Sequence, residues 1–89
     1  MKIKEGFVVR TLGEKTLVVP TGEASKSFHG MIELNDTGAF IWDLVSKGLD
    51  EGDIAKKFAE KYNVDETTAL NDTKEIIEKM KNAGVIEDE

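Results

Sequence analysis

Few side chains in this sequence could carry out chemistry on a bound molecule. The 89 residues include no cysteine and a single histidine, His29. The absence of cysteine excludes disulfides, thiolate zinc ligands and a cysteine nucleophile, and one histidine excludes a histidine pair. Catalysis requires a nucleophile, a base and a group that orients the base, and too few such parts are present. We therefore expect no catalytic residue, and we interpret His29 as a solvated surface side chain.

Acidic residues offer the remaining route to a metal site. Hard cations bind closely spaced carboxylates beside a turn glycine, and the nearest candidate is Asp50-Glu51-Gly52-Asp53. It lacks the later ligands of such a loop, so the segment is better explained as the start of a helix. We expect neither a metal nor a cofactor. An acidic carrier protein would need a serine that opens a helix, and no serine stands in such a motif.

The charge distribution argues against nucleic acid as a ligand. The formal net charge is −6, and residues 36–89 contain seven basic and fourteen acidic side chains. An acidic surface repels the phosphate backbone. No apolar run approaches the roughly 20 residues that span a bilayer, and the amino terminus lacks the apolar stretch of a signal peptide. We expect no membrane association and a cytoplasmic location.

Two segments rich in β-branched residues near the amino terminus predict a hairpin. Residues 7–12 and 16–19 flank Gly13-Glu14, and glycine at the first position of a two-residue loop is typical of a type II′ turn. Pro20 cannot donate a hydrogen bond to a sheet and should end the second strand. We expect a polar loop over 21–30 and a short third strand over 31–34.

Three later segments with clear start signals predict three helices. Asn35 or Asp36 can cap the first, Asp50 the second and Asp65 the third, because Asn and Asp are favoured at helix N-caps. The second and third segments carry apolar stripes at 3.6-residue spacing. Gly84 occupies the position where a left-handed residue commonly ends a helix.

Three strands followed by three helices indicate an α+β fold in one domain over 1–89. We expect an N-terminal three-stranded antiparallel sheet and a winged helix-turn-helix-like arrangement of the helices. This order also permits a winged-helix DNA-binding transcriptional regulator, since a fold alone does not decide function. The third helix contains no arginine, the residue that most often reads guanine. The regulator is therefore the alternative.

The segment from Leu34 to Leu44, LNDTGAFIWDL, resembles the LN-x-T-(small)-(small)-x-I-W-x-L signature of the PqqD family, which is named after the pyrroloquinoline quinone biosynthesis protein D. The resemblance covers about residues 30–87 and continues, in order, through Gly48, Ile54, the segment 62–65, Asp72 and the closing segment 83–86. The LN-x-T…IW segment is the specific part, and the other positions support it by their order.

This resemblance implies a peptide chaperone and not an enzyme. Members of the family, also called precursor-peptide recognition elements, bind the leader of a ribosomally synthesised precursor peptide. They present it to a modifying enzyme, commonly a radical SAM protein. In the family, the leader adds to the third strand of the sheet and lies in a groove against the third helix.

The expected peptide-binding residues come from the third strand and from one flank of the third helix. A short strand that follows a long loop should be an edge strand, which invites strand addition. On the helix, i, i+3 and i+4 spacing defines two flanks. The expected set is Met31, Ile32, Glu33, Leu34, Leu70, Lys74, Ile77 and Lys81. The opposite flank, with Ala69, Asp72, Ile76 and Lys79, is the competing choice, because the sequence does not orient the helix.

Two apolar residues also have a purely structural interpretation. Trp42 lies among Ile41, Leu44 and Val45, so we expect it in the core. Ile77 can either anchor a peptide or pack against the second helix. If the amide of Ile32 faces the open edge, Ile32→Pro should weaken peptide binding without unfolding the domain. The sequence leaves the oligomeric state open.

Overall fold

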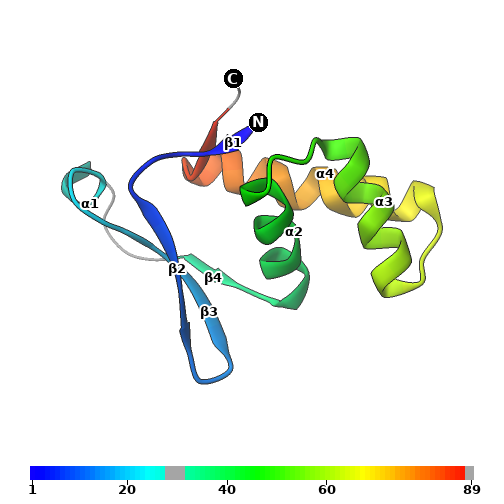
Figure 1. Ribbon diagram of the computed structural model, residues 1–89, viewed down its shortest axis with the longest axis horizontal. Coiled ribbons are helices and arrows are strands. Elements are labelled where there is room, and N and C mark those ends of the chain that lie inside the picture. Colours follow the sequence, from blue (N-terminus) through cyan, green and yellow to red (C-terminus); the bar gives the residue numbers. More distant parts are fainter. Residues whose placement is uncertain (28–31, 88–89) are drawn as a thin grey trace.

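The computed structural model describes residues 1–27 and 32–87. Its elements follow in the order β1 (Lys2–Ile3), β2 (Phe7–Leu12), β3 (Lys15–Pro20), α1 (Ala24–Ser27), β4 (Ile32–Leu34), α2 (Asp36–Ser46), α3 (Glu51–Tyr62), α4 (Glu66–Ala83) and β5 (Ile86–Glu87). The predicted α+β fold, with a three-stranded antiparallel sheet followed by three long helices, is confirmed (Figure 1). Met31, the expected first residue of the third strand, and His29 lie outside the described residues.

The sheet is built on a hairpin whose turn the sequence predicts. Gly13 has a positive φ of 64°, whereas Glu14 does not, as a type II′ turn requires. β2 pairs with β3 from Leu12↔Lys15 at the turn to Phe7↔Pro20 at the open end. Pro20 ends β3, as expected. Beyond it, the Thr21 N–H donates to the Gly6 carbonyl at 2.6 Å.

Each of the three long helices begins at a side chain that accepts a hydrogen bond from the first turn. Asn35 Oδ1 accepts from the Gly38 N–H at 2.9 Å, and Asp50 and Asp65 do the same for α3 and α4 at 2.8 and 2.7 Å. These contacts satisfy amides that have no partner within the helix. The predicted helix starts are therefore confirmed, with Asn35 rather than Asp36 as the first cap.

Gly84 ends α4 and returns the chain to the core. Its φ is 82°, its N–H donates to the Lys81 carbonyl at 3.0 Å, and the Val85 N–H donates to the Met80 carbonyl at 3.2 Å. This pair of bonds is a Schellman motif. It brings Val85 into the core, where the side chain is 1% exposed.

Three short elements are not predicted by the sequence. Residues 24–27 form the single-turn helix α1 within the expected polar loop. β1 and β5 pair antiparallel through Lys2↔Glu87 and Ile3↔Ile86, so the two ends of the described chain lie side by side (Figure 1). Two-residue strands carry too little periodicity to be read from a sequence.

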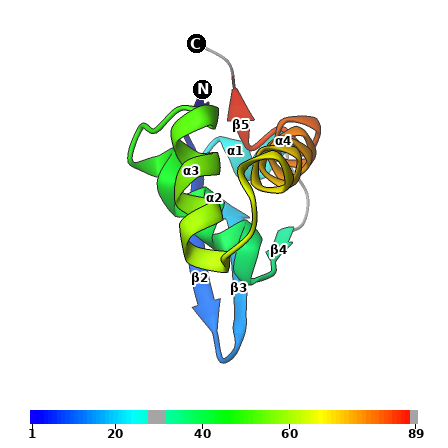
Figure 2. The same ribbon diagram turned by 90° about the vertical axis from the view of Figure 1, so that its right-hand side faces the viewer.

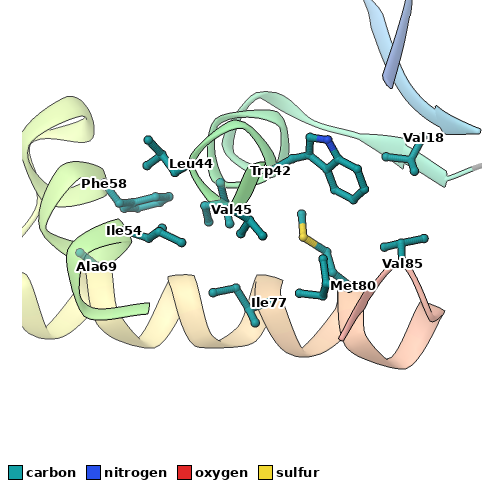
Figure 3. Close-up of a cluster of buried hydrophobic side chains, with 12 residues drawn as sticks. Val18, Trp42, Leu44, Val45, Ile54, Phe58, Ala69, Ile77, Met80 and Val85 are labelled. Atoms are coloured by element: carbon teal, nitrogen blue, oxygen red, sulfur yellow. The ribbon is translucent and has the colours of Figure 1, made fainter. Parts of the chain in front are cut away.

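The hydrophobic core lies between α2, α3, α4 and the inner face of the sheet. Trp42 and Val45 of α2 face Met80 and Ile77 of α4, and Val18 of β3 closes the sheet side (Figure 3). Trp42 is 6% exposed, so its predicted core position is confirmed. Side chains of α2 pack against both α4 and the sheet. This packing fixes how α4 is rotated about its own axis relative to β4.

Candidate functional site

A groove of about 560 Å³ runs between β4 and the second half of α4. Both elements lie on the same side of the molecule (Figure 2). The groove also reaches the tip of the β2–β3 hairpin and the start of α2. Its lining residues are Glu14, Lys15, Ile32, Glu33, Leu34, Asn35, Asp36, Gly38, Ile76, Lys79, Met80, Ala83 and Val85.

β4 is an edge strand of the sheet. The strand order is β2-β3-β4, so within the described residues β4 has β3 as its single neighbour. The pairing register is Thr16↔Leu34, Leu17↔Glu33 and Val18↔Ile32. The second side of β4 therefore presents backbone groups to the groove.

The register determines which backbone groups of β4 face the open edge. Hydrogen-bonded and non-hydrogen-bonded pairs alternate along antiparallel strands, and the bond from Thr21 to Gly6 fixes the phase of this alternation. The backbone N–H and C=O groups of odd-numbered β3 residues therefore point to β2, and those of Thr16 and Val18 point to β4. The backbone groups of their partners, Leu34 and Ile32, point back to β3. The N–H and C=O of Glu33 are therefore the groups that face outward.

The Ile32→Pro prediction made from the sequence requires the Ile32 amide to face the open edge, and the register does not meet this requirement. The amide of Ile32 points to β3, and proline at this position would remove a bond of the sheet. Weakened binding by Ile32→Pro would thus report damage to the sheet. The informative position for a proline is Glu33.

Side chains of β4 alternate between the two faces of the sheet. Ile32 and Leu34 are half-buried and pack against the core. Glu33 is exposed on the other face, where its carboxylate lies 3.7 Å from Lys15 Nζ. A peptide strand added to β4 would alternate in the same way. Every second side chain would enter the groove, between β4 and α4.

The helical wall of the groove is formed by one flank of α4. Ile76 and Ala83 are half-buried, and Met80 lies beneath them at 4% exposure. Lys79 is exposed at the rim and its Nζ lies 3.6 Å from Glu75 Oε1. These residues recur at i+3 and i+4 spacing, which places them on one face of a helix. The wall is therefore apolar at its base and charged at its rim.

The groove ends where α2 begins. Asn35 Oδ1 accepts from the Thr37 hydroxyl at 3.0 Å as well as from the Gly38 amide. The Asn35 carbonyl accepts from the Ala39 N–H at 2.9 Å. Because helix formation occupies this carbonyl, a strand added to β4 cannot continue its pairing along α2.

The structure places the sequence-predicted residues in different environments. Ile32, Glu33 and Leu34 line the groove. Ile77 is 2% exposed and belongs to the core, which supports the structural interpretation of this residue. Leu70 is half-buried, Lys74 is exposed and Lys81 is half-buried, and none of these three lines the groove.

The competing flank of α4 contributes more to the groove than the favoured flank. Ile76 and Lys79 line it, whereas Ala69 is fully buried and Asp72 is half-buried elsewhere on the helix. The stripe Ala69, Thr73, Ile77 and Met80 faces the core, and this rotation turns Ile76 and Lys79 toward β4. The sequence shows the stripe but not which side of it meets the strand.

The sequence did not predict the lining residues that lie neither in β4 nor on the two flanks of α4. Glu14 and Lys15 reach the groove from the hairpin tip, and Asp36 and Ala83 from the ends of helices. One signal was available: Ile76, Lys79 and Ala83 stand at positions i, i+3 and i+7 of the helix, which lie on one face. The approach of the hairpin tip had no local signal.

A cluster of aromatic side chains marks a second surface, between α2 and α3. The rings of Phe40 and Tyr62 meet edge to face at 5.8 Å, and Lys61 Nζ lies 5.3 Å from the Phe40 ring centroid. Partial burial, followed by the nearby carboxylate of Asp36, raises the pKa of the Tyr62 hydroxyl. Tyr62 packs against the rings of Phe40 and Phe58.

Residues 1–27 and 32–87 contain neither a cluster of metal-ligating side chains nor a helix suited to a membrane. No group of three or more His, Cys, Asp or Glu side chains is placed to hold a metal ion there. In the same part of the chain, no helix is both long enough and apolar enough to cross a membrane.

The fold is shared with two solved structures of protein–peptide complexes. The first, described as TbiB1 in complex with the TbiA(beta) leader peptide, is 20% identical, with a TM-score of 0.82 and coverage of 100% of this chain and 98% of that chain. The second, described as lasso peptide synthetase B1 complexed with the leader peptide, is 20% identical, with a TM-score of 0.78 and coverage of 94% and 93%. No curated protein sequence matches the chain.

These matches define the class of fold, and a sequence-family match defines the family. The model of the family described as coenzyme PQQ synthesis protein D (PqqD) matches residues 12–86. The chain belongs to the PqqD family, as the segment from Leu34 to Leu44 indicates.

Proposed function

We propose that this chain binds the leader segment of a ribosomally synthesised precursor peptide as an added strand beside β4. The observation that carries the proposal is the outward-facing backbone of Glu33 at the rim of an apolar groove. Strand addition gains affinity from main-chain hydrogen bonds and selectivity from side-chain pockets, and both are available here. Membership of the PqqD family and the fold shared with two leader-peptide complexes support the same conclusion.

The geometry refines the residues proposed to contact the peptide. On the sheet they are Ile32, Glu33 and Leu34, with Met31 included because it precedes β4 in the chain. On α4 they are Ile76, Lys79, Met80 and Ala83, which line the groove. Leu70, Lys74 and Lys81 do not line it, so we leave them out of the proposed contact set.

The proposed role of the complex is to present the peptide to a separate modifying enzyme. The described residues that line the groove supply carboxylates, lysines and apolar side chains, and none of them is a histidine or cysteine that could act as base or nucleophile. The chain would thus act as a binding accessory protein. We propose a radical SAM maturase as its enzyme partner, in keeping with the usual partner in this family.

A winged-helix transcriptional regulator is the less favoured function. α4 would be the helix that enters the major groove of DNA, but its side chains include Glu66, Asp72, Glu75 and Glu78 against three lysines. A protein that binds DNA gains most of its non-specific affinity from cations that neutralise phosphates. The charge of α4 opposes this contribution.

A titration followed by nuclear magnetic resonance tests the proposal. The probe is the cognate precursor peptide, added to ¹⁵N-labelled protein. We expect the amide signals of Glu33, Leu34, Ile76 and Lys79 to shift, and that of Lys74 to stay in place. Shifts centred on Leu70 and Lys74 would favour the other flank of α4. If saturating precursor shifts no signal in β4 or α4, the proposed function is wrong.

The enzyme partner is tested separately. We expect the radical SAM enzyme that modifies the precursor to act faster when this chain is added at equal concentration. Mass spectrometry of the precursor measures the rate. If binding is observed but the rate does not change, the peptide-binding proposal stands and the proposed partner is wrong.

A further inference from the structure

Two residues of β4 give the groove an apolar surface. Ile32 and Leu34 lie on the groove side of the strand, and the strand residue between them, Glu33, lies on the other face. A peptide residue directly opposite Ile32 or Leu34 has its side chain on that same groove side. There it would meet Ile76, Met80 or Ala83 of the opposite wall. An added strand is therefore recognised by two apolar side chains separated by one residue.

The charged residues of the groove are unequally neutralised. Lys15 pairs with Glu33 at 3.7 Å, and Lys79 pairs with Glu75 at 3.6 Å. Glu14 and Asp36 also line the groove, but within the described part of the chain no ion pair includes either of them. Among the described lining residues, Glu14 and Asp36 are therefore carboxylates outside any ion pair, whereas Lys15 and Lys79 are both paired.

The sheet register places these two carboxylates at the same end of the groove. Thr16 lies opposite Leu34, so Glu14, two residues before Thr16, and Asp36, two residues after Leu34, both lie beyond the same end of the β3–β4 pairing. Both carboxylates are exposed, as expected for side chains that meet a ligand at a rim. A ligand anion has less to gain at the start of α2, because Asn35 already accepts the bond from the Gly38 amide.

We propose that the leader recognised by this chain carries an apolar–any–apolar segment with a basic residue beside it, at the end nearest α2. This inference rests on the proposed function and deepens it by naming the chemistry of the peptide. The apolar pair lies against Ile76, Met80 and Ala83, and the basic side chain lies between Glu14 and Asp36. The sheet–helix groove sets the spacing of the apolar pair, and the two carboxylates set which end is basic.

Selection from a random peptide library tests this inference. The full chain is immobilised and exposed to random peptides displayed on phage, and the enriched sequences are read. We expect apolar residues in alternation with Lys or Arg beside them. Synthetic copies of the enriched peptides should bind about fivefold more weakly when the basic residue is replaced by Gln, the change expected for an exposed ion pair.

Matched charge variants connect the preference to the groove. Glu14→Gln combined with Asp36→Asn should remove the preference for a basic residue and keep the apolar alternation. Glu60→Gln combined with Glu78→Gln removes the same charge from exposed positions outside the groove, and should leave the preference unchanged. Circular dichroism melting of each variant confirms that the domain folds.

The outcomes separate this inference from the proposed function. Enriched peptides that shift the Glu33 amide but carry no basic residue, or an acidic one, overturn the inference alone. An equal basic preference in both double variants also overturns it, because the preference would then arise from the net charge of the protein. If no peptide is enriched, the groove does not bind peptides and both proposals are wrong.

Discussion

Thr73 places a hydroxyl group in the centre of an otherwise apolar core. The side chain is fully buried, and Oγ1 has no hydrogen-bond partner. Burying an unpaired hydroxyl is unfavourable, and valine has nearly the same shape. We expect Thr73→Val to raise the free energy of unfolding by about 1 kcal/mol, measured by urea denaturation.

An exposed threonine of the same helix supplies the control for this substitution. Thr67→Val makes the same chemical change at a solvated position of α4, and we expect a change within about 0.5 kcal/mol. If Thr73→Val destabilises the protein and Thr67→Val does not, the Thr73 hydroxyl makes a favourable interaction in the core.

Asp65 makes the stability of α4 dependent on pH. The hydrogen bond from the Thr68 amide stabilises the carboxylate and lowers its pKa below the usual 3.8. A carboxyl group with a lowered pKa in the folded state contributes stability above the pKa of the unfolded state. This contribution is lost as the pH falls through the lower pKa of the folded state.

Comparison with Asp65→Asn isolates that contribution. Asparagine is also a favourable N-cap but does not titrate. The difference in stability between wild type and Asp65→Asn should shift in favour of the variant when the pH is lowered from 5 to 2. Thermal melts at both pH values measure it. A difference that does not change with pH would show that the cap carboxylate does not contribute.

At this scale the sequence predicts what depends on local chemistry. The caps Asn35, Asp50 and Asp65 and the end signal Gly84 each act within one turn of a helix, so the sequence contains both partners of each contact. The environment of Ile77 depends on how α2 and α3 pack on α4. No local pattern distinguishes a core isoleucine from a peptide anchor.

The short strands β1 and β5 stabilise the molecule more than their length indicates. Ile86 is 4% exposed and pairs with Ile3, while the Lys4 N–H donates to the Val85 carbonyl at 2.9 Å. The two strands thus cover the end of the core beyond α4. Their contribution arises from burial, since the Lys2–Glu87 ion pair at 3.7 Å is exposed and contributes little.

Replacing one isoleucine of each strand by alanine tests this interpretation. We expect Ile86→Ala to lower the free energy of unfolding by about 3 kcal/mol, and Ile3→Ala, at a half-buried position, to lower it by less. Urea denaturation measures both. A loss below about 1 kcal/mol for Ile86→Ala would mean that the chain end does not cover the core.

The elements themselves were largely predictable, but one relation between them was not. Strong periodicity and caps define the long helices, and the Gly13-Glu14 turn defines the hairpin. The flank of α4 that faces β4 follows from the rotation of the helix, which is fixed by the stripe through Thr73 and Ile77. Since the sequence contains two similar flanks beside this stripe, only tertiary packing selects Ile76 and Lys79.

At the scale of the whole molecule, the three-stranded sheet has two open edges within the described residues, and the β4 edge adjoins the groove against α4. β4 forms one edge and β2 the other. β2 is longer and exposes Leu12 at its end, with 64% of the residue accessible. The two edges make competing predictions for where a peptide strand is added, and the central claim requires the β4 edge.

Proline substitution at each edge decides between them. By the alternation along the sheet, the amides of Glu33 in β4 and Thr11 in β2 both point away from β3, and both residues are exposed. Proline removes the amide at either site without breaking a bond of the sheet. Glu33→Ala removes the Glu33 side chain and its ion pair with Lys15 but keeps the amide.

The most direct test is therefore the affinity of the precursor peptide for these three variants, measured by calorimetric titration, with melting curves to verify folding. We predict that Glu33→Pro weakens binding about tenfold, as the loss of one main-chain hydrogen bond implies. Glu33→Ala and Thr11→Pro should bind within about twofold of wild type, because exposed ion pairs contribute little. Equal affinities of Glu33→Pro and Glu33→Ala, or a loss confined to Thr11→Pro, would contradict strand addition at β4.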